Sequence, residues 1–193
     1  MSRVIVVGPR DKIEQADRAN GLVVNTTSRS KNWSRGLSPF VLGPCKLYGG
    51  YVSQNMENAW QYSKVYSQFV DKDDNITEHY FVWARNGWKQ GYANRYPMGK
   101  GAVPKFSYWD GKRMDYVDAR KKIYVPLYYR AVKDTGAYKI LRDMYLSNDV
   151  IYLWDFDGYR NDLLGMNLVD VLNCPDRKMG HAFVLARMLE KRI

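Results

Sequence analysis

The segment 54–69 carries three side chains whose types and spacing suit chemistry on a substrate. Glu57, Gln61 and Lys64 follow one another at intervals of four and three residues. On a helix these intervals place side chains on one face. A carboxylate on that face is a candidate to stabilise positive charge or to activate water. The alternative is a solvated glutamate that only pairs with Gln61.

Two further carboxylates follow an apolar run near the C-terminus. Asp155 and Asp157 flank Phe156 in the sequence WDFDGY, directly after the run from Val150 to Trp154. The run predicts a strand, so both carboxylates would lie where that strand ends. A pair of carboxylates there suits catalysis, whereas capping of the following turn is the alternative.

Basic residues and aromatic rings alternate in two glycine-containing stretches, 26–51 and 92–112. Basic side chains of this kind bind phosphates, and exposed aromatic rings stack on nucleobases. The alternative places the rings in the hydrophobic core. The basic residues that we expect to contact nucleic acid are Arg29, Lys31, Arg95, Lys100 and Lys105.

Composition supports a partner that carries phosphates and gives no support for a metal or a cofactor. The 193 residues hold 30 Lys and Arg against 20 Asp and Glu, a net charge of +10, which favours association with polyanions. The two cysteines are too few and too far apart for a disulfide framework or a zinc site, and neither they nor the two histidines have the partner residues in sequence that a Cys–His pair needs. We therefore predict no metal, no cofactor and DNA as the partner.

No segment resembles a membrane span or a secretory leader. The apolar run Val4 to Val7 is too short for a leader, and no stretch approaches the roughly 20 apolar residues that span a bilayer. We expect a soluble, cytoplasmic protein with no membrane partner. Its oligomeric state is left open.

The periodicity of apolar residues predicts an α+β fold, predominantly α-helical, as a single domain over residues 1–193 with a few short strands. A dinucleotide-binding fold is excluded because no Gly-x-Gly-x-x-Gly follows the first strand. The stretches 26–50 and 91–112 are predicted as loops. The predicted strands are 4–7, 22–24 and 150–154. The predicted helices are 54–69 with Ser53 as N-cap, 77–90, 117–131 interrupted or kinked at Pro126, 137–145 and 179–190.

The run SPFVLGPCKLYGGYVSQNMENAWQYSK resembles the NADAR family, also called YbiA-like. Further segments keep the family order: Ser28 to Lys31, the helix DYVDARKKIYVPLYYRAV, the strand and acidic turn IYLWDFDGY, and the closing GHAFVLARMLE. The resemblance covers most of the chain from Asn25 onward. Two departures stand out: Asn58 replaces the usual histidine, and WDFDGYRNDLLG replaces a turn that normally ends in Trp-Gly.

NADAR proteins are N-glycosidases, so the resemblance implies cleavage of a C–N bond at an anomeric carbon and a NADAR-like fold. Glu57 matches the family's helix glutamate and Lys64 its lysine, while Asp155 or Asp157 matches the later acidic position. We expect Lys64 or Arg35 to hold a phosphate or the leaving base. The residues expected to bind substrate are Asn25, Ser28, Arg35, Tyr48, Asn58, Trp60 and Gln61.

These observations together predict a DNA glycosylase that excises a modified base, for example from phage DNA, and leaves an abasic site. One alternative is a NADAR-type hydrolase of ADP-ribosylated bases or small N-glycosides. Another is a nucleic-acid-binding module without catalytic activity. A subsequent lyase step would need an activated lysine, for which Lys64 is the candidate.

Overall fold

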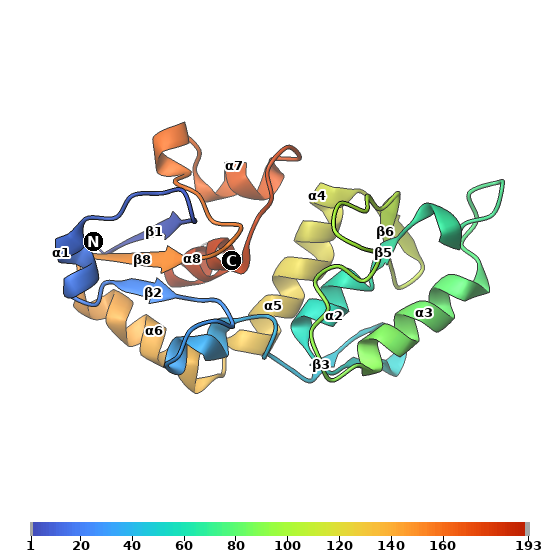
Figure 1. Ribbon diagram of the computed structural model, residues 1–193, viewed down its shortest axis with the longest axis horizontal. Helices are drawn as coiled ribbons and strands as arrows, with labels where there is room; N and C mark the ends of the chain where they lie inside the picture. The colour runs from blue at the N-terminus through green and yellow to red at the C-terminus, as the bar shows by residue number, and fades with distance from the viewer. Residues whose placement is uncertain (1, 192–193) are drawn as a thin grey trace. The chain divides into compact units, whose positions relative to one another are not determined.

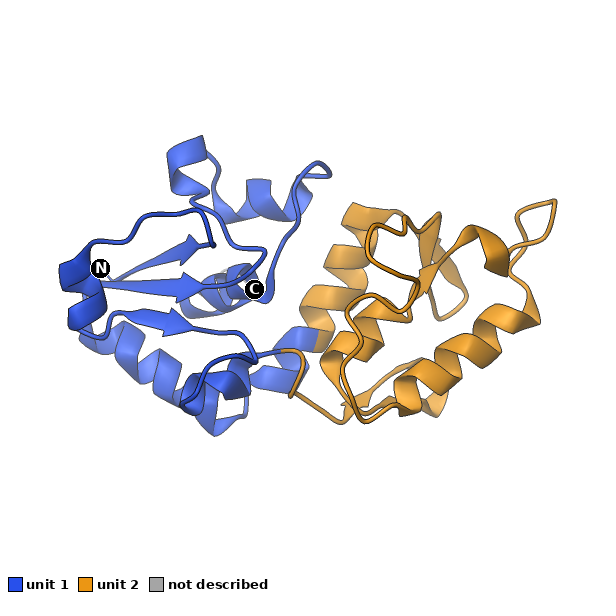
Figure 2. Cartoon of the chain, viewed as in Figure 1, with its two compact units in different colours: residues 1–38, 128–193 blue, residues 39–127 orange. Residues whose placement is uncertain are grey.

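The computed structural model describes residues 2–191, and the chain divides into two compact units (Figure 2). Residues 1–38 and 128–193 belong to unit 1, and residues 39–127 belong to unit 2. Both units contain helices and strands, with 43% helix in all. The predicted α+β class is therefore confirmed.

Unit 1 is built on a three-stranded parallel sheet, with the strand order β1 (Arg3–Val7), β8 (Val150–Trp154), β2 (Val23–Asn25) (Figure 1). All three strands were predicted. Val7 and Asn25 both lie in register with Trp154, so the three carboxyl ends meet at one edge. This edge of the sheet, with the residues that follow each strand, is called the carboxyl edge below.

Helices cover the sheet of unit 1. The helix α8 (His181–Leu189) contacts β1 and β8, and α6 (Gly136–Ser147) contacts β8. In α8 every residue except Arg187 is buried, as expected for a helix packed on several sides. The sequence interpretation placed both helices correctly to within two residues, but it missed α1 (Gln15–Ala19) and α7 (Leu168–Asn173).

Unit 2 contains two small antiparallel sheets, the helices α2 (Met56–Gln61) and α3 (Glu78–Lys89), and the start of a long helix at its C-terminal end. One sheet pairs β3 (Cys45–Lys46) with β4 (Val52–Ser53). The other has the order β5 (Lys64–Val65), β6 (Phe106–Trp109), β7 (Lys112–Met114). The core of this unit is largely aromatic and comprises Tyr62, Val65, Tyr66, Phe69, Tyr80, Ala84 and Trp88.

The predicted helix over 54–69 is wrong in extent and in its cap. Asn55, not Ser53, is the N-cap of α2, and its side chain accepts a hydrogen bond from the amide of Asn58. The helix ends at Gln61 because Lys64 and Val65 pair with Ser107 and Phe106 in a sheet. Strand pairing across 40 residues of chain overrides local helix propensity here.

The predicted loop 91–112 is wrong in its second half, because the segment from Phe106 to Met114 forms a β-hairpin. Asp110 and Gly111 make its turn with positive φ angles of 48° and 79°. An Asp-Gly pair between aromatic and basic residues is a strong hairpin pattern that the sequence interpretation overlooked. The other predicted loop, 26–50, contains 3₁₀ turns at Trp33–Leu37 and Tyr48–Gly50 as well as β3.

The long helix expected around Pro126 is interrupted, as predicted. It consists of α4 (Tyr116–Ala119), a π-helical segment (Arg120–Tyr124) and α5 (Val125–Val132). The wider turn precedes the proline, which has no amide hydrogen to donate to the preceding turn. No helix within residues 2–191 combines the length and the apolar character needed to cross a membrane.

Candidate functional site

A hydrogen-bonded chain of side chains links Glu57, Gln61 and Lys64 in unit 2. Gln61 Nε2 donates to Glu57 Oε1 at 2.9 Å, and Lys64 Nζ donates to Gln61 Oε1 at 2.7 Å. These three residues, with the rings of Trp60 and Tyr124, are called the Glu57 cluster. The three polar side chains predicted to share a face do lie together, although Lys64 comes from the strand β5.

The chemistry of Lys64 fixes the orientation of the Gln61 amide. An ammonium group only donates hydrogen bonds, so it must face the amide oxygen of Gln61. The amide nitrogen then faces Glu57, whose oxygen accepts. Glu57 is 6% exposed, so the alternative of a solvated glutamate is wrong, although its pairing with Gln61 is confirmed.

Two rings lie beside this chain. Lys64 Nζ is 4.9 Å from the centroid of the Trp60 ring, within range of a cation–π interaction. The Trp60 and Tyr124 rings are 5.1 Å apart. A carboxylate, an ammonium and an indole therefore lie close together, which is a combination suited to a substrate with both positive charge and a flat ring.

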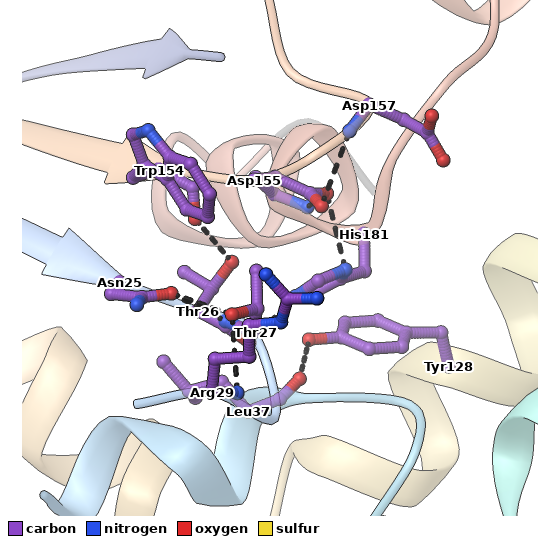
Figure 3. Close-up of polar contacts among 11 residues, drawn as sticks. Asn25, Thr26, Thr27, Arg29, Leu37, Tyr128, Trp154, Asp155, Asp157 and His181 are labelled. Atoms are coloured by element: carbon purple, nitrogen blue, oxygen red, sulfur yellow. Dashed lines mark hydrogen bonds and ion pairs between the residues drawn. The ribbon is translucent and has the colours of Figure 1, made fainter. Parts of the chain in front are cut away.

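The second carboxylate cluster lies at the carboxyl edge in unit 1 (Figure 3). Asp155 directly follows β8 and is 5% exposed. Its Oδ2 accepts from the amide of Ala182 at 3.2 Å and lies 3.1 Å from Nδ1 of His181. Its Oδ1 accepts from the amide of Asp157 at 3.5 Å. Asp155 thus caps the N-terminus of α8, which satisfies an amide that has no partner within the helix.

His181 joins this carboxylate to the loop that follows β2. Its Nε2 lies 2.8 Å from the carbonyl oxygen of Thr26, opposite the contact of Nδ1 with Asp155. A carbonyl and a carboxylate only accept hydrogen bonds, so both ring nitrogens must carry hydrogen. The geometry therefore favours a charged imidazolium paired with an ionised Asp155.

The ionisation of Asp155 follows from two opposing effects. Burial alone would raise its pKa, but the charge and hydrogen bond of His181, with the amides of Ala182 and Asp157, hold the pKa below its usual value. Burial raises the pKa of Tyr128 far above its usual value, and the negative charge of Asp155 raises it further. Tyr128 stays neutral and donates from its hydroxyl to the carbonyl of Leu37.

The capping role considered for the acidic turn is thus found at Asp155, although the capped helix begins 26 residues later. The Asp157 side chain is half-buried, and its catalytic role stays a prediction. Gly180 is required by this arrangement, because a β-carbon there would lie 2.0 Å from Asp155 Oδ2. The site interpretation missed His181 altogether, because nothing in the sequence connects it with Asp155.

The loop after β2 is shaped by its own polar side chains. Asn25 Oδ1 accepts from the amide of Thr27 at 3.0 Å and from its hydroxyl at 2.8 Å. Asn25, predicted to bind substrate, therefore stabilises the loop. Arg29 places its guanidinium 4.9 Å from the centroid of the Phe156 ring. Of the remaining predicted residues here, Ser28 is half-buried and Lys31 and Arg35 are exposed.

In unit 2, Tyr48 is half-buried in a group of rings, with the Trp109 ring 4.9 Å from its own. Burial, together with the neighbouring Tyr108, raises the pKa of Tyr48, so its hydroxyl is neutral. Among the predicted basic contacts, Arg95 lies over the Tyr96 ring, Lys100 is exposed and Lys105 pairs with Asp74. Asn58 is wholly buried, and its amide binds backbone groups of the segment 87–94.

Comparison with protein-family models, with curated proteins and with solved structures finds no match to the chain. Within residues 2–191 no three His, Cys, Asp or Glu side chains are grouped so as to hold a metal ion.

Proposed function

We propose that this protein is an N-glycosidase that removes a modified base from DNA, and that Glu57 is its catalytic carboxylate. The observation that carries this proposal is the Glu57 cluster. It holds a buried carboxylate at a fixed position by the Gln61 amide, with Lys64 and the Trp60 ring adjacent. The resemblance to the NADAR family supports the same reaction.

The reaction breaks the bond between the anomeric carbon and a nitrogen of the base. The bonding electrons leave with the base, and positive charge develops on the sugar. Ionised Glu57 stabilises that charge and accepts a proton from the attacking water, whose oxygen bonds to the anomeric carbon. Lys64 donates a hydrogen bond to the departing base, which then takes up the proton held by Glu57, and Trp60 stacks on the base.

The charge of the protein supports DNA as the substrate. The net charge is +10, and no acidic residue occurs between Glu78 and Asp110, a segment with five basic residues. Such a segment binds phosphates without regard to sequence. A base within a duplex must leave the stack before a buried carboxylate can reach its sugar.

A nucleic-acid-binding module without catalytic activity is the second candidate. It is favoured by the position of Asp155, whose carboxylate accepts hydrogen bonds from protein groups at the start of α8. Asp155 therefore has a structural role, and its catalytic role stays a prediction. If Glu57 is likewise structural, the protein binds DNA and releases no base.

The test compares the wild type with Glu57→Gln and with Glu78→Gln, a control that removes an exposed glutamate of α3. Each protein is incubated with unmodified, hypermodified and ADP-ribosylated DNA, and released products are identified by mass spectrometry. We expect the wild type and the control to release a modified base, and Glu57→Gln to be slower by at least about 100-fold.

Other outcomes point to the remaining candidates. Release of ADP-ribose alone supports the ADP-ribosyl hydrolase considered from the sequence. Binding of DNA without release from any of the three substrates supports the binding module, and equal activity of Glu57→Gln removes Glu57 from the mechanism.

A further inference from the structure

A single buried side chain fixes the segment that follows α3. Asn58 Nδ2 donates to the carbonyl of Tyr92 at 2.8 Å and to the carbonyls of Gly87 and Gln90 at 3.2 Å each. Asn58 Oδ1 accepts from the amide of Asn94 at 2.8 Å. The start of the segment 90–96, called the Tyr92 loop, is thus tied by its backbone to the helix that carries Glu57.

Tyr62, just after the same helix, holds the Tyr92 loop from a second side. Its ring packs against Gly87, where a β-carbon would come within 2.1 Å of two ring carbons. Its hydroxyl donates to Gln90 Oε1 at 3.1 Å and accepts from Asn94 Nδ2 at 3.5 Å. The loop backbone is therefore ordered before any ligand binds, so little conformational entropy is lost on binding.

This ordered backbone presents aromatic rings to solvent. Tyr92 is 66% exposed and Tyr96 is 42% exposed. Lys89 and Lys100 are exposed near the two ends of the loop, and the segment contains no acidic residue. A fixed loop with exposed rings, flanked by cations, has the features of a surface that stacks bases and holds the phosphates between them.

The exposed rings favour a single strand over a duplex. In a duplex the faces of the bases are covered by their neighbours, so a protruding ring has no face to stack on. An unpaired base offers its whole face, and stacking of this kind is tolerant of sequence.

We infer that the Tyr92 loop binds single-stranded DNA by stacking an unpaired base on Tyr92, and that Asn58 is the residue that positions the loop. The inference rests on DNA as the partner in the proposed function and adds which form of DNA is bound. It also gives Asn58 a role in binding through the loop and not by direct contact with the substrate.

The test measures binding of the full-length protein to a fluorescent oligothymidylate by anisotropy, with a hairpin duplex and an oligouridylate as competitors. Tyr92→Ala is compared with Tyr92→Phe, which keeps the ring, and with Tyr129→Ala, which removes an exposed tyrosine of α5. We expect Tyr92→Ala to weaken binding by about 5- to 150-fold, the range for loss of one stacked base. Tyr92→Phe and Tyr129→Ala should bind within about twofold of the wild type.

Asn58→Ala should also weaken binding of the oligothymidylate. Adding Tyr92→Ala to Asn58→Ala should lower the affinity by a smaller factor than Tyr92→Ala does in the wild type, because both changes remove the same stacking interaction. Thermal unfolding of each variant shows whether it is folded. Equal binding by Tyr92→Ala and the wild type overturns the inference, as does tighter binding of the duplex or of the oligouridylate. The readout requires no base release, so a protein that binds through Tyr92 but releases no base contradicts only the proposed function.

Discussion

Two carboxylate side chains are buried within residues 2–191, and they are held in different ways. Asp155 in unit 1 accepts from two backbone amides and contacts an imidazolium, all at points where a strand ends or a helix begins. Glu57 in unit 2 accepts from the side-chain amide of Gln61, four residues along the same helix. One carboxylate joins backbone segments far apart in sequence, whereas the other is oriented by a neighbouring side chain.

This difference suggests that Asp155 stabilises the fold, whereas Glu57 is suited to a role in catalysis. Removing Asp155 leaves a buried helix end and a buried imidazolium without their acceptor. Replacing Glu57 by glutamine keeps its shape and keeps an oxygen for Gln61. The comparison therefore predicts a large loss of stability in the first case and a loss of activity in the second.

The largest expected effect on stability comes from Asp155→Asn. It removes one partner of a buried ion pair, and we expect the free energy of unfolding to fall by about 3–5 kcal/mol. Urea unfolding followed by circular dichroism measures this change. The control is Asp134→Asn, which removes an exposed carboxylate 3.8 Å from Lys133 and should change stability by less than about 1 kcal/mol. Equal effects of Asp155→Asn and Glu57→Gln on stability would erase the distinction between the two carboxylates.

Gly180→Ala should have an intermediate effect. The added methyl would lie 2.0 Å from Asp155 Oδ2, so the carboxylate or the start of α8 must move. We expect a loss of about 1–3 kcal/mol, the usual cost of overpacking. Gly136→Ala, at the start of α6, meets nothing within 4 Å and should be neutral or slightly stabilising. A tolerated Gly180→Ala would show that the Asp155 contacts are less tightly fixed than the structure indicates.

The smallest effect is the pH dependence that Asp155 contributes. Its pKa is lowered in the folded state despite burial, chiefly by His181. The stabilisation is therefore fully present above the unfolded pKa of about 3.9 and is lost as the pH falls through the folded value, at about 1.4 kcal/mol per unit of lowering. The free energies of unfolding of the wild type and Asp155→Asn should therefore differ by a constant amount above about pH 4 and approach each other as the pH falls below about 4. A difference in the free energy of unfolding between the two proteins that stays constant down to about pH 3 would contradict an ionised Asp155.

Local pattern was enough to predict several elements of this protein. The apolar run Val150 to Trp154 predicted both ends of β8 correctly, and the apolar spacing after Gly180 indicated α8. Both signals lie within a few residues of chain, where side-chain periodicity reports directly on burial. Glu57 and Gln61 were paired correctly for the same reason, because a helix brings residues four apart into contact.

Contacts between distant segments decided the rest. The sequence continues a helical pattern past Gln61, but pairing with β6 turned Lys64 and Val65 into a strand. His181 appeared inert because its partners, Asp155 and the Thr26 carbonyl, are 26 and 155 residues away. Asn58 was read as a substrate ligand, but the structure directs its amide to the backbone of the Tyr92 loop.

The sequence by itself determined which side chains are available: a basic chain, an aromatic-rich segment free of acidic residues, and the carboxylates Glu57, Asp155 and Asp157. Only the tertiary structure decided how each is used, because burial and hydrogen-bond partners depend on segments that meet after folding. In the folded protein Asp155 caps a helix that is distant in sequence. Glu57 is linked to Lys64 through the hydrogen bonds of the Gln61 amide.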